Sequence, residues 1–401
     1  MKYLILVPDG AADYPLEELK YKTPLEYAYK PNIDFLTEKG CCGLMETIPH
    51  GFSAGSEVAN LTILGYNPEK CYQGRGVLEA AALGINIFQD EVVFRCNTIF
   101  IDNDRIVSHS AGHISTEESR KLIEDLNKEF ASEQIKFYPG LDYRHILILK
   151  DGFSPMVECF PPHDNIGRDF KLLLPKALTP QAKKTEKMLM DLIMNSRRIL
   201  NHHPVNIKRI NSGKQPANFI WPWSPGKKPD MELFTKKFGI SGAVISAVDL
   251  IKGIGIYAGF QVINVPGATG LYNTNYEGKA NAAIDALKKF DLVYVHVEAP
   301  DEAAHEGNVQ LKIKCIEDFD ERLVGTILKN IDLMNTTIAV IPDHYTPVSV
   351  RCHSDEDVPF VIYSPRLKPD NVKSFNEKSC SNGILGKLKG EQFIKSFLNT
   401  R

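Results

Sequence analysis

Short runs of apolar residues recur towards both ends of the chain, and each has the length of one buried strand. They contain few polar residues, which is typical of strands covered on both faces of a sheet. The runs lie at residues 3–7, 260–265, 292–297, 336–341 and 359–363. Segments with helical spacing of apolar residues alternate with them, at residues 240–259, 279–290 and 316–331. Strands that alternate with helices predict an α/β domain with a mostly parallel sheet.

The middle of the chain follows a different pattern. It contains β-like runs at residues 91–101 and 145–150, a proline-rich loop and one long basic amphipathic helix over residues 179–200. The basic stretch from Lys183 to Lys214 could help to hold an anionic substrate, but a solvated face of an amphipathic helix is the interpretation that we favour. We therefore expect one α/β core, formed by residues 1–75 and 216–401, that is interrupted by an inserted α+β domain of residues 76–215.

Composition excludes several classes of protein. The net charge of −3 gives no electrostatic reason to expect a nucleic-acid partner. The eight cysteines are scattered and suit reduced thiols in a cytoplasmic protein. The apolar run near the N-terminus stops at Asp9, which is too early for a signal peptide or a membrane span. We expect a cytoplasmic protein with a small-molecule partner and no membrane, and the sequence leaves the oligomeric state open.

Aspartate and histidine side chains gather where the apolar runs end. Taken singly, each has an ordinary explanation, such as a turn, a cap or a salt bridge between residues four apart. Taken together they are informative, because ligands bind at the carboxyl ends of the strands in open α/β sheets. Mixed carboxylate and imidazole ligands suit Mn²⁺ or Zn²⁺, and six of them would serve two ions, as in phosphoryl displacement. The candidate ligands are Asp9, Asp301, His305, Asp343, His344 and His353.

Ser56 lies in a stretch of small residues, "GFSAGSEVAN", at an expected helix start. One interpretation is a helix cap. The other is a nucleophile, because the N–H groups and dipole of a helix N-terminus favour a phosphoryl group and a metal ion activates a serine hydroxyl. The two interpretations are compatible.

The ordered set of motifs resembles the cofactor-independent phosphoglycerate mutases, and among them the shorter, archaeal-type branch. That family belongs to the alkaline phosphatase superfamily of metal-dependent phosphotransferases. The resemblance spans nearly the whole chain and implies an alkaline-phosphatase-like core with an insert that closes over the substrate. The motifs are "PDG", "GSEVANLTILGYNP", "GRGVLEAAALGI", "PGATG", "PDEAAHEG", "PDHYTP" and "CHSDEDVPF".

The resemblance implies that the chain interconverts 3-phosphoglycerate and 2-phosphoglycerate without bisphosphoglycerate, with Ser56 as the phosphoryl carrier. It also implies two divalent ions, with Mn²⁺ as the first choice and Zn²⁺ or Mg²⁺ as alternatives. One ion would be held by Asp9, Ser56, Asp343 and His344, and the other by Asp301, His305 and His353.

Further residues take roles from the same resemblance. Lys252 would lie near the phosphoryl group. His163 and Asp164, in "PPHDNIG", are candidates for proton transfer or substrate contact. Arg75 would bind substrate or stabilise a hinge between domains. His113 stands where the archaeal-type pattern ends in an arginine, and it is a substrate-binding candidate.

One stretch departs from the family pattern. After the insert the family has arginines that bind substrate, whereas residues 217–230 contain none and carry Trp221 and Trp223 instead. This departure predicts weak recognition of phosphoglycerate. It keeps three alternatives open: a homoserine kinase-like phosphotransferase of the same superfamily, an inactive metal-binding homologue, and a phosphatase whose insert fails to exclude water.

Overall fold

The computed structural model describes residues 1–399 and divides the chain into two compact units. Unit 1 comprises Met1–Tyr72 and Asp230–Arg401, and unit 2 comprises Gln73–Pro229. The chain returns to unit 1 later than the expected residue 216. The reason is strand β9 (Phe219–Gly226), which pairs with β3 (Val92–Asp102) and so belongs to the sheet of unit 2.

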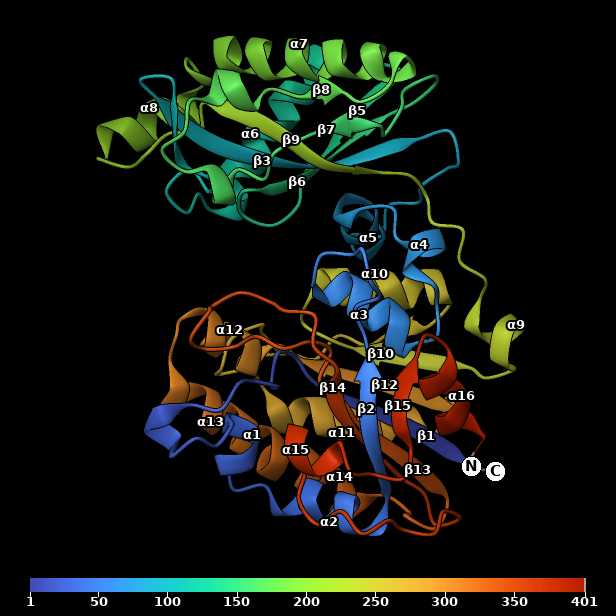
Figure 1. The fold of residues 1–401 in the computed structure, drawn as a ribbon. Coiled ribbons are helices and arrows are strands. Elements are labelled where there is room, and N and C mark those ends of the chain that lie inside the picture. Colours follow the sequence, from blue (N-terminus) through green and yellow to red (C-terminus); the bar gives the residue numbers. More distant parts are fainter. Residues whose placement is uncertain (400–401) are drawn as a thin grey trace. The chain divides into compact units, whose positions relative to one another are not determined.

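Unit 1 is built around one eight-stranded sheet, with its strands side by side and helices around them (Figure 1). The strand order is β11-β10-β12-β1-β13-β14-β2-β15, and every pairing is parallel except the two made by β14. The sheet is therefore mostly parallel, as the alternation of strands and helices predicted. Its strands are β1 (Lys2–Pro8), β2 (Cys41–Glu46), β10 (Gly242–Ile245), β11 (Gln261–Val262), β12 (Leu292–Val297), β13 (Thr336–Val340), β14 (Val358–Tyr363) and β15 (Gly386–Lys389).

The helices of unit 1 connect these strands. One long helical stretch passes through a π-helical segment, Phe319–Val324, between α13 and α14. A short 3-10 helix lies at Glu17–Leu19. The α-helices are α1 (Pro24–Tyr27), α2 (Pro31–Lys39), α3 (Ser56–Ile63), α4 (Pro68–Cys71), α9 (Phe234–Phe238), α10 (Asp249–Ala258), α11 (Tyr276–Leu287), α12 (Ala299–His305), α13 (Val309–Asp318), α14 (Gly325–Asn330), α15 (Glu377–Cys380) and α16 (Gln392–Leu398).

One sequence prediction in this unit is wrong. Residues 240–259 do not form a single helix, because Gly242–Ile245 form strand β10 and only Asp249–Ala258 form helix α10. A run of four apolar residues fits a buried strand as well as a helix turn, so periodicity alone cannot separate the two. Strand β2, which contains Cys41 and Cys42, was also not anticipated.

Unit 2 is an α+β unit with an antiparallel sheet. Strand β3 is central and pairs with β4, β6 and β9. Short 3-10 helices lie at His163–Asn165, Phe170–Leu173 and Pro180–Ala182. The remaining elements are α5 (Arg75–Ala82), β4 (Arg105–Ser108), α6 (Thr116–Phe130), β5 (Ile135–Tyr138), β6 (Arg144–Leu149), β7 (Val157–Glu158), β8 (Lys176–Ala177), α7 (Lys183–Leu200) and α8 (Pro204–Asn211).

The two faces of the sheet in unit 2 carry different side chains. Phe94 and Cys96 of β3 pack with Leu122 of α6 and Leu189 of α7 in one buried core, and α7 runs along the sheet (Figure 1). Because side chains alternate along a strand, Arg95 points to the opposite face. That face is where β9 presents its tryptophans, since directly paired residues share a face.

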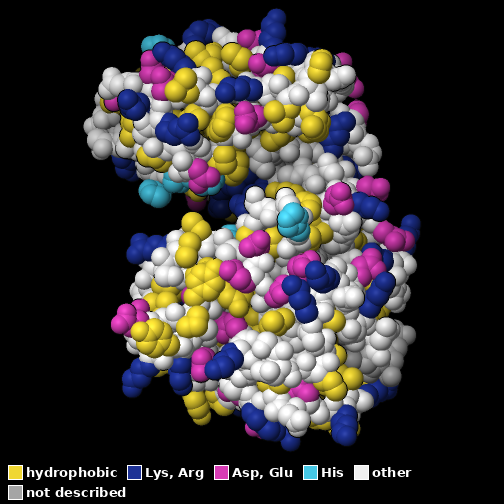
Figure 2. All heavy atoms as spheres, viewed as in Figure 1, with side chains coloured by type: hydrophobic (Ala, Val, Ile, Leu, Met, Phe, Trp, Pro, Cys, Tyr) yellow, Lys and Arg dark blue, Asp and Glu magenta, His cyan; other side chains and the backbone are white. Residues whose placement is uncertain are grey.

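Charge on the surface and the length of the helices are the next features of the fold. On the face drawn in Figure 2, basic and acidic side chains are interspersed over both units. Among residues 1–399, the structure contains no helix that is both long and apolar enough to cross a membrane.

Candidate active site

Three neighbouring parallel strands carry the candidate aspartates to one edge of the sheet in unit 1. Strand β1 lies between β12 and β13, and both pairings are parallel. Asp9 follows β1 directly, Asp343 lies three residues after β13, and Asp301 lies in α12, just after β12. Gly10 has a positive φ of 60°, and a Cβ there would lie 2.5 Å from an Asp301 carboxylate oxygen. Glycine at this position therefore lets the strand end approach Asp301 closely.

Asp301, His305 and His353 form one group of candidate ligands. The Nε2 atom of His305 lies 3.2 Å from Asp301 Oδ2 and 3.0 Å from His353 Nε2. His353 Nε2 lies 3.5 Å from Asp301 Oδ1. The other ring nitrogen of His305, Nδ1, lies 3.0 Å from the carbonyl oxygen of Arg351 and donates to it. That hydrogen bond leaves Nε2 as the nitrogen with the lone pair when the imidazole is neutral, which is the arrangement that a metal ligand requires.

Ser56, Asp9, Asp343 and His344 form a second group. Ser56 Oγ lies 3.1 Å from His344 Nε2. The same nitrogen lies 3.4 Å from Asp9 Oδ1 and 3.7 Å from Asp343 Oδ2. His344 is fully buried, so its ring is fixed between the serine and the two carboxylates.

Ser56 is the first residue of α3 and does not act as its cap. The N-cap position is Gly55, and no side chain caps the helix there. The Ser56 hydroxyl turns to His344 instead, which favours the nucleophile interpretation over the capping one. Asn60, one turn further along α3, donates from Nδ2 to Ser56 O and to Asp343 Oδ2, both at 2.8 Å. Asn60 thereby ties the helix start to a candidate ligand.

His296 is a candidate ligand that the sequence reading missed. It lies on β12, is fully buried, and its Nε2 is 3.1 Å from Asp9 Oδ2 and 3.9 Å from Asp343 Oδ2. These three residues place one potential ligand atom each within 4.8 Å of one another, as do Asp301, His344 and His353. The signal in the sequence was a single histidine inside an otherwise apolar strand, which alone is more often a core residue. The division of ligands between two ions stays a prediction.

Thr346 links the two groups through one hydroxyl. It is fully buried, and its Oγ1 donates to Asp301 Oδ1 at 2.5 Å. Because its only proton is used there, the hydroxyl accepts from His344 Nδ1 at 3.1 Å. Protonation at Nδ1 directs the lone pair of His344 towards Ser56. One threonine therefore fixes both the Asp301 carboxylate and the tautomer of His344.

The donor set fits divalent cations. Two of its buried atoms, Asp9 Oδ1 and His296 Nε2, have no hydrogen-bond partner within the described chain, and such atoms are costly unless something binds them. Burial and the neighbouring Asp343 raise the pKa of Asp9 well above its ordinary value. The hydrogen bond to Asp301 raises the pKa of His305 to about 9. Protons thus compensate the carboxylates here, and a bound cation would take over that role.

The pKa of Asp343 is shifted in the opposite direction to that of Asp9, although both carboxyl groups are buried. Burial opposes its ionisation, but His344 and His296 outweigh that cost and hold the pKa of Asp343 below its ordinary value. His344 therefore lies beside two carboxylates of different character. Asp343 favours the ionised form, whereas Asp9 holds a proton more readily than an ordinary aspartate.

Lys252 lies on α10, and among the described residues no direct contact joins it to the candidate ligands. Its Nζ pairs with Asp249 at 3.1 Å on α10. Its charge also contributes to the lowered pKa of Lys279, which burial brings to about 8. Lys279 Nζ donates to the carbonyl oxygen of His296 at 3.0 Å. A buried amine that sequence reasoning missed therefore supports the strand that carries His296.

The other substrate candidates lie in unit 2. The ring centroid of His163 lies 5.3 Å from that of Trp223 and 6.1 Å from that of His109. Burial lowers the pKa of His163, with Asp164 opposing and Arg95 adding to the effect. Asp164 Oδ1 is 3.6 Å from His163 Nε2. Arg75, at the start of α5, donates its backbone N–H to Ser224 Oγ at 3.0 Å.

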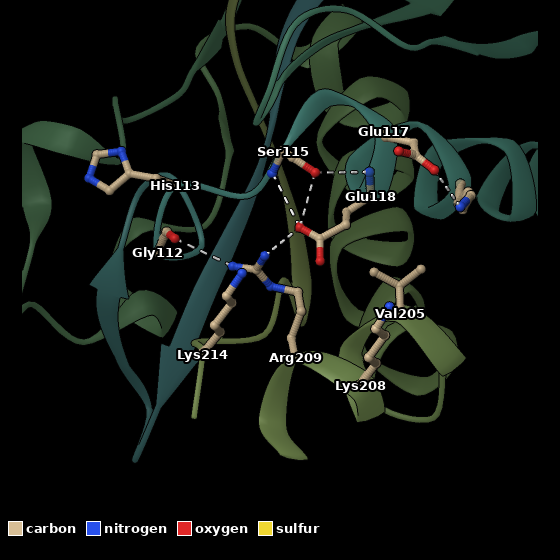
Figure 3. A pocket seen from close by; sticks show the side chains of 10 residues that line it. Gly112, His113, Ser115, Glu117, Glu118, Val205, Lys208, Arg209 and Lys214 are labelled. Carbon is tan, nitrogen blue, oxygen red and sulfur yellow. Dashed lines mark hydrogen bonds and ion pairs between the residues drawn. The ribbon is translucent and has the colours of Figure 1, made fainter. Parts of the chain in front are cut away.

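His113 lines a separate surface pocket of about 480 Å³ in unit 2. In Figure 3 its imidazole points away from the centre of the pocket, where Arg209 meets Glu118. The Arg209 guanidinium already donates to Glu118 at 2.6 Å and to the carbonyl oxygens of Gln215 and Ala111. The buried cation of this pocket therefore serves the fold, and Arg209 differs from the solvated basic residues that were expected in this stretch.

Comparison with known proteins adds to this geometry. A family model described as 2,3-bisphosphoglycerate-independent phosphoglycerate mutase matches residues 37–206. The protein so named from Methanosarcina acetivorans is 49% identical over 397 residues, which covers 98% of both chains. The one from Thermococcus kodakarensis is 36% identical over 403 residues, with coverage of 98% of this chain and 95% of that chain.

Solved structures agree over the same length. The PH0037 protein from Pyrococcus horikoshii matches with a TM-score of 0.85 and 31% identity, over 100% of this chain and 97% of that chain. The cofactor-independent phosphoglycerate mutase from Thermoplasma acidophilum matches with a TM-score of 0.70 and 28% identity, over 99% of both. As the resemblance of its motifs implied, the chain belongs to the family of 2,3-bisphosphoglycerate-independent phosphoglycerate mutases.

Proposed function

We propose that this chain interconverts 3-phosphoglycerate and 2-phosphoglycerate through a phosphoserine at Ser56. The observation that carries the proposal is the position of the Ser56 hydroxyl. It lies at the N-terminus of α3, 3.1 Å from the Nε2 atom of His344 and beside two buried carboxylates. A serine whose side chain does not cap its helix and faces a ligand set is placed for nucleophilic attack on a phosphoryl group.

The residues of unit 1 would act in sequence on one phosphoryl group. The backbone N–H groups at the start of α3 bind its oxygens, and the helix dipole favours its charge. Ser56 Oγ gives up its proton and attacks phosphorus as the bond to the glycerate oxygen breaks, and that oxygen takes up a proton, so one proton is lost and one is gained in the step. In the second step the other hydroxyl of glycerate gives up its proton and attacks the phosphorus of phosphoserine, the bond to Ser56 Oγ breaks, and Oγ takes up a proton, which restores Ser56. Lys252 is the candidate for an additional positive charge near this group.

Two divalent cations, Mn²⁺ by preference, would supply charge neutralisation of the phosphoryl oxygens and a lower pKa for the serine hydroxyl. We assign them to Asp9, Ser56, Asp343 and His344 on one side and to Asp301, His305 and His353 on the other, with His296 as an added candidate. His344 and Thr346 hold the ligand geometry for both.

Unit 2 is proposed as the part that holds glycerate and excludes water. Water reaching the phosphoserine would turn the mutase into a phosphatase. His163 and Asp164 are the candidates for moving the proton between glycerate and its surroundings. Since its substrates are those of glycolysis, we place the protein in the cytoplasm.

The experiment is a product analysis of purified protein loaded with Mn²⁺. The protein is incubated with 3-phosphoglycerate in the absence of 2,3-bisphosphoglycerate, and the reaction is monitored by ³¹P NMR. We expect 2-phosphoglycerate to form. Release of inorganic phosphate alone would show a phosphatase instead. Phosphorylation of homoserine by ATP, with no conversion of phosphoglycerate, would replace the proposal with a kinase.

A further inference from the structure

Lys312 is a fully buried lysine of unit 1 to which the proposed chemistry assigns no role. It lies on α13, and its side chain is 0% exposed. Its Nζ atom donates to Asp13 Oδ2 at 2.7 Å, to the carbonyl oxygen of Thr346 at 2.9 Å and to that of Ala12 at 3.2 Å. Three acceptors around one nitrogen require three N–H donors, and only the charged ammonium has them. All three donors of this cation are therefore used inside the protein.

Asp13 is the charged partner of Lys312 and is equally buried. Besides the ammonium, its Oδ2 accepts from the backbone N–H of Val348 at 3.1 Å. Its Oδ1 accepts from the backbone N–H of Tyr14 at 2.7 Å. The carboxylate thus connects the lysine to backbone groups on two different segments of the chain.

These two segments both carry candidate ligands. The segment after β1 begins with Asp9, and the segment after β13 contains Asp343 and His344. The peptide backbone of Thr346 lies between the segments, because its N–H donates to the carbonyl oxygen of Ala12 at 3.2 Å and its own carbonyl oxygen accepts from the buried ammonium. A shift of either segment would break a buried backbone hydrogen bond, which costs free energy.

Thr346 transmits this restraint to the ligands. Its backbone is held by Lys312, while its hydroxyl donates to Asp301 and accepts from His344 Nδ1. There is little free space around the hydroxyl, since a Cβ at Gly10 would lie 2.6 Å from Thr346 Oγ1. Helix α13 also follows α12, the helix that carries Asp301. The hydrogen bonds printed for the described residues therefore join Lys312 to the ligand-bearing segments without contact to a ligand itself.

Stability alone does not account for this buried ion pair. Taking two charges out of water costs free energy, and apolar side chains of similar volume often leave a fold equally stable in place of such a pair. Apolar side chains cannot supply direction, because they make no hydrogen bonds. A fully satisfied network of buried hydrogen bonds instead specifies one arrangement of the segments that it joins.

We propose that Lys312 and Asp13 are positioning residues of the metal centre, and that they hold the segments after β1 and β13 in the arrangement for metal binding before a cation arrives. The inference rests on the proposed function as far as that function places divalent cations on these ligands. Ligands that are already in place lose little conformational freedom when the ion binds, so the affinity is higher. Loss of the pair should then weaken metal binding although neither residue is a ligand.

Calorimetric titration of metal-free protein with Mn²⁺ is the first test. Lys312→Met should bind Mn²⁺ about 10- to 100-fold more weakly than the wild type. The double variant Lys312→Met, Asp13→Asn should show a similar loss, and it leaves no unpaired buried charge that would oppose folding. Lys30→Met is the matched control, because Lys30 is also a buried lysine of unit 1 but its partners are Asp34 and Ser374. It should keep the wild-type affinity. Wild-type affinity in the Lys312 variants as well would overturn the proposal.

Hydrogen exchange of the wild type tests the proposal without any substitution. The amide of Thr346 donates to Ala12 and that of Val348 donates to Asp13, so both should exchange slowly in metal-free protein, and Mn²⁺ should add little protection. Mass spectrometry of peptides that span residues 344–350 measures this exchange. Fast exchange in metal-free protein, with protection only after Mn²⁺ is added, would show that the cation arranges the segments and that the ion pair does not.

Activity separates this inference from the proposed function. Lys312→Met should need about 10- to 100-fold more Mn²⁺ for half-maximal activity, and added Mn²⁺ should restore activity, which it would not do for a protein with a damaged fold. A wild type that binds Mn²⁺ but does not convert phosphoglycerate would contradict the proposed function alone. An active wild type whose Lys312 variants keep its Mn²⁺ affinity would contradict the inference alone.

Discussion

The two units hold polar clusters of opposite construction. In unit 1 the cluster is acidic and buried, with three aspartates and their histidines at the edge of a parallel sheet. In unit 2 it is basic, and its arginine lies on the face of an antiparallel sheet, stacked on a tryptophan. A buried acidic set needs cations to compensate it, whereas Arg95 in unit 2 already has a carboxylate beside it, with 3.0 Å between its Nε atom and Glu79 Oε2. Under the proposed function, phosphoryl chemistry belongs to unit 1, and unit 2 is the part proposed to hold glycerate.

Loss of the Ser56 hydroxyl should have the largest effect. Ser56→Ala should lower kcat by a factor on the order of 10⁴ or more, because no other group in unit 1 is assigned to carry the phosphoryl group. Thermal unfolding should change little, since the substitution removes one small group. Substantial mutase activity in this variant would contradict the proposal that phosphoryl transfer takes place at Ser56 of unit 1.

Replacement of a metal-ligand side chain should have the second-largest effect. His305→Ala and His353→Ala should each lower the content of tightly bound Mn²⁺ to a similar degree, because both imidazoles face Asp301. Metal analysis of dialysed protein measures this directly, and activity should fall by at least about 100-fold. His202→Ala, at an exposed position in unit 2, is the control and should keep its metal. If all three variants bound metal equally, the acidic cluster would not be the metal site.

Thr346→Val should have a smaller effect on the same site. The methyl group that replaces the hydroxyl can neither donate to Asp301 nor accept from His344. The two groups of candidate ligands therefore lose the hydrogen bonds that connect them. We expect Mn²⁺ to bind about 10- to 100-fold more weakly, as measured by calorimetry. Thr346→Ser should restore most of the affinity. Unchanged binding in the valine variant would mean that the ligands hold themselves in place.

The smallest expected effect is on the stability of unit 2. His145 is fully buried and accepts from Gly140 N at 3.1 Å, and burial lowers its pKa to about 3. The unfolded chain binds a proton near pH 6.5, so stability from the neutral ring is present above that pH and is lost as pH falls towards 3. Between pH 7 and pH 5 this loss is about 2 kcal/mol.

Urea unfolding followed by tryptophan fluorescence reports on unit 2, because both tryptophans lie there. His145→Asn keeps an acceptor for Gly140 and removes the titrating ring. As pH falls from 7 to 5, the free energy of unfolding of the wild type should therefore fall relative to that of the variant. A pH-independent difference would show that His145 does not titrate between the two states.

The sequence predicted the acidic cluster much better than the basic one. Asp9, Asp301 and Asp343 follow strands that are parallel neighbours, and parallel strands deliver their carboxyl ends to one edge whatever their register. His296 escaped notice because a histidine inside a strand gives no pattern of its own. Thr346 escaped because a hydroxyl next to a ligand motif has no signature until its hydrogen bonds are known.

Arg95 depends on a different kind of information. Its contact with Trp223 is set by the register of β3 against β9, two strands separated by more than a hundred residues. A shift of one residue would place the arginine on the other face, so the pairing cannot be read from local patterns. The same pairing explains why residues 216–229 belong to unit 2 rather than to the core.

The central claim is that Ser56 carries the phosphoryl group between the two positions of glycerate. The most direct test is rapid acid quenching of the Mn²⁺-loaded enzyme during turnover of 3-phosphoglycerate labelled with ³²P, followed by peptide mapping. The account predicts an acid-stable label on the peptide that contains Ser56. An acid-labile label on a histidine, or turnover with no label on the protein, would contradict it.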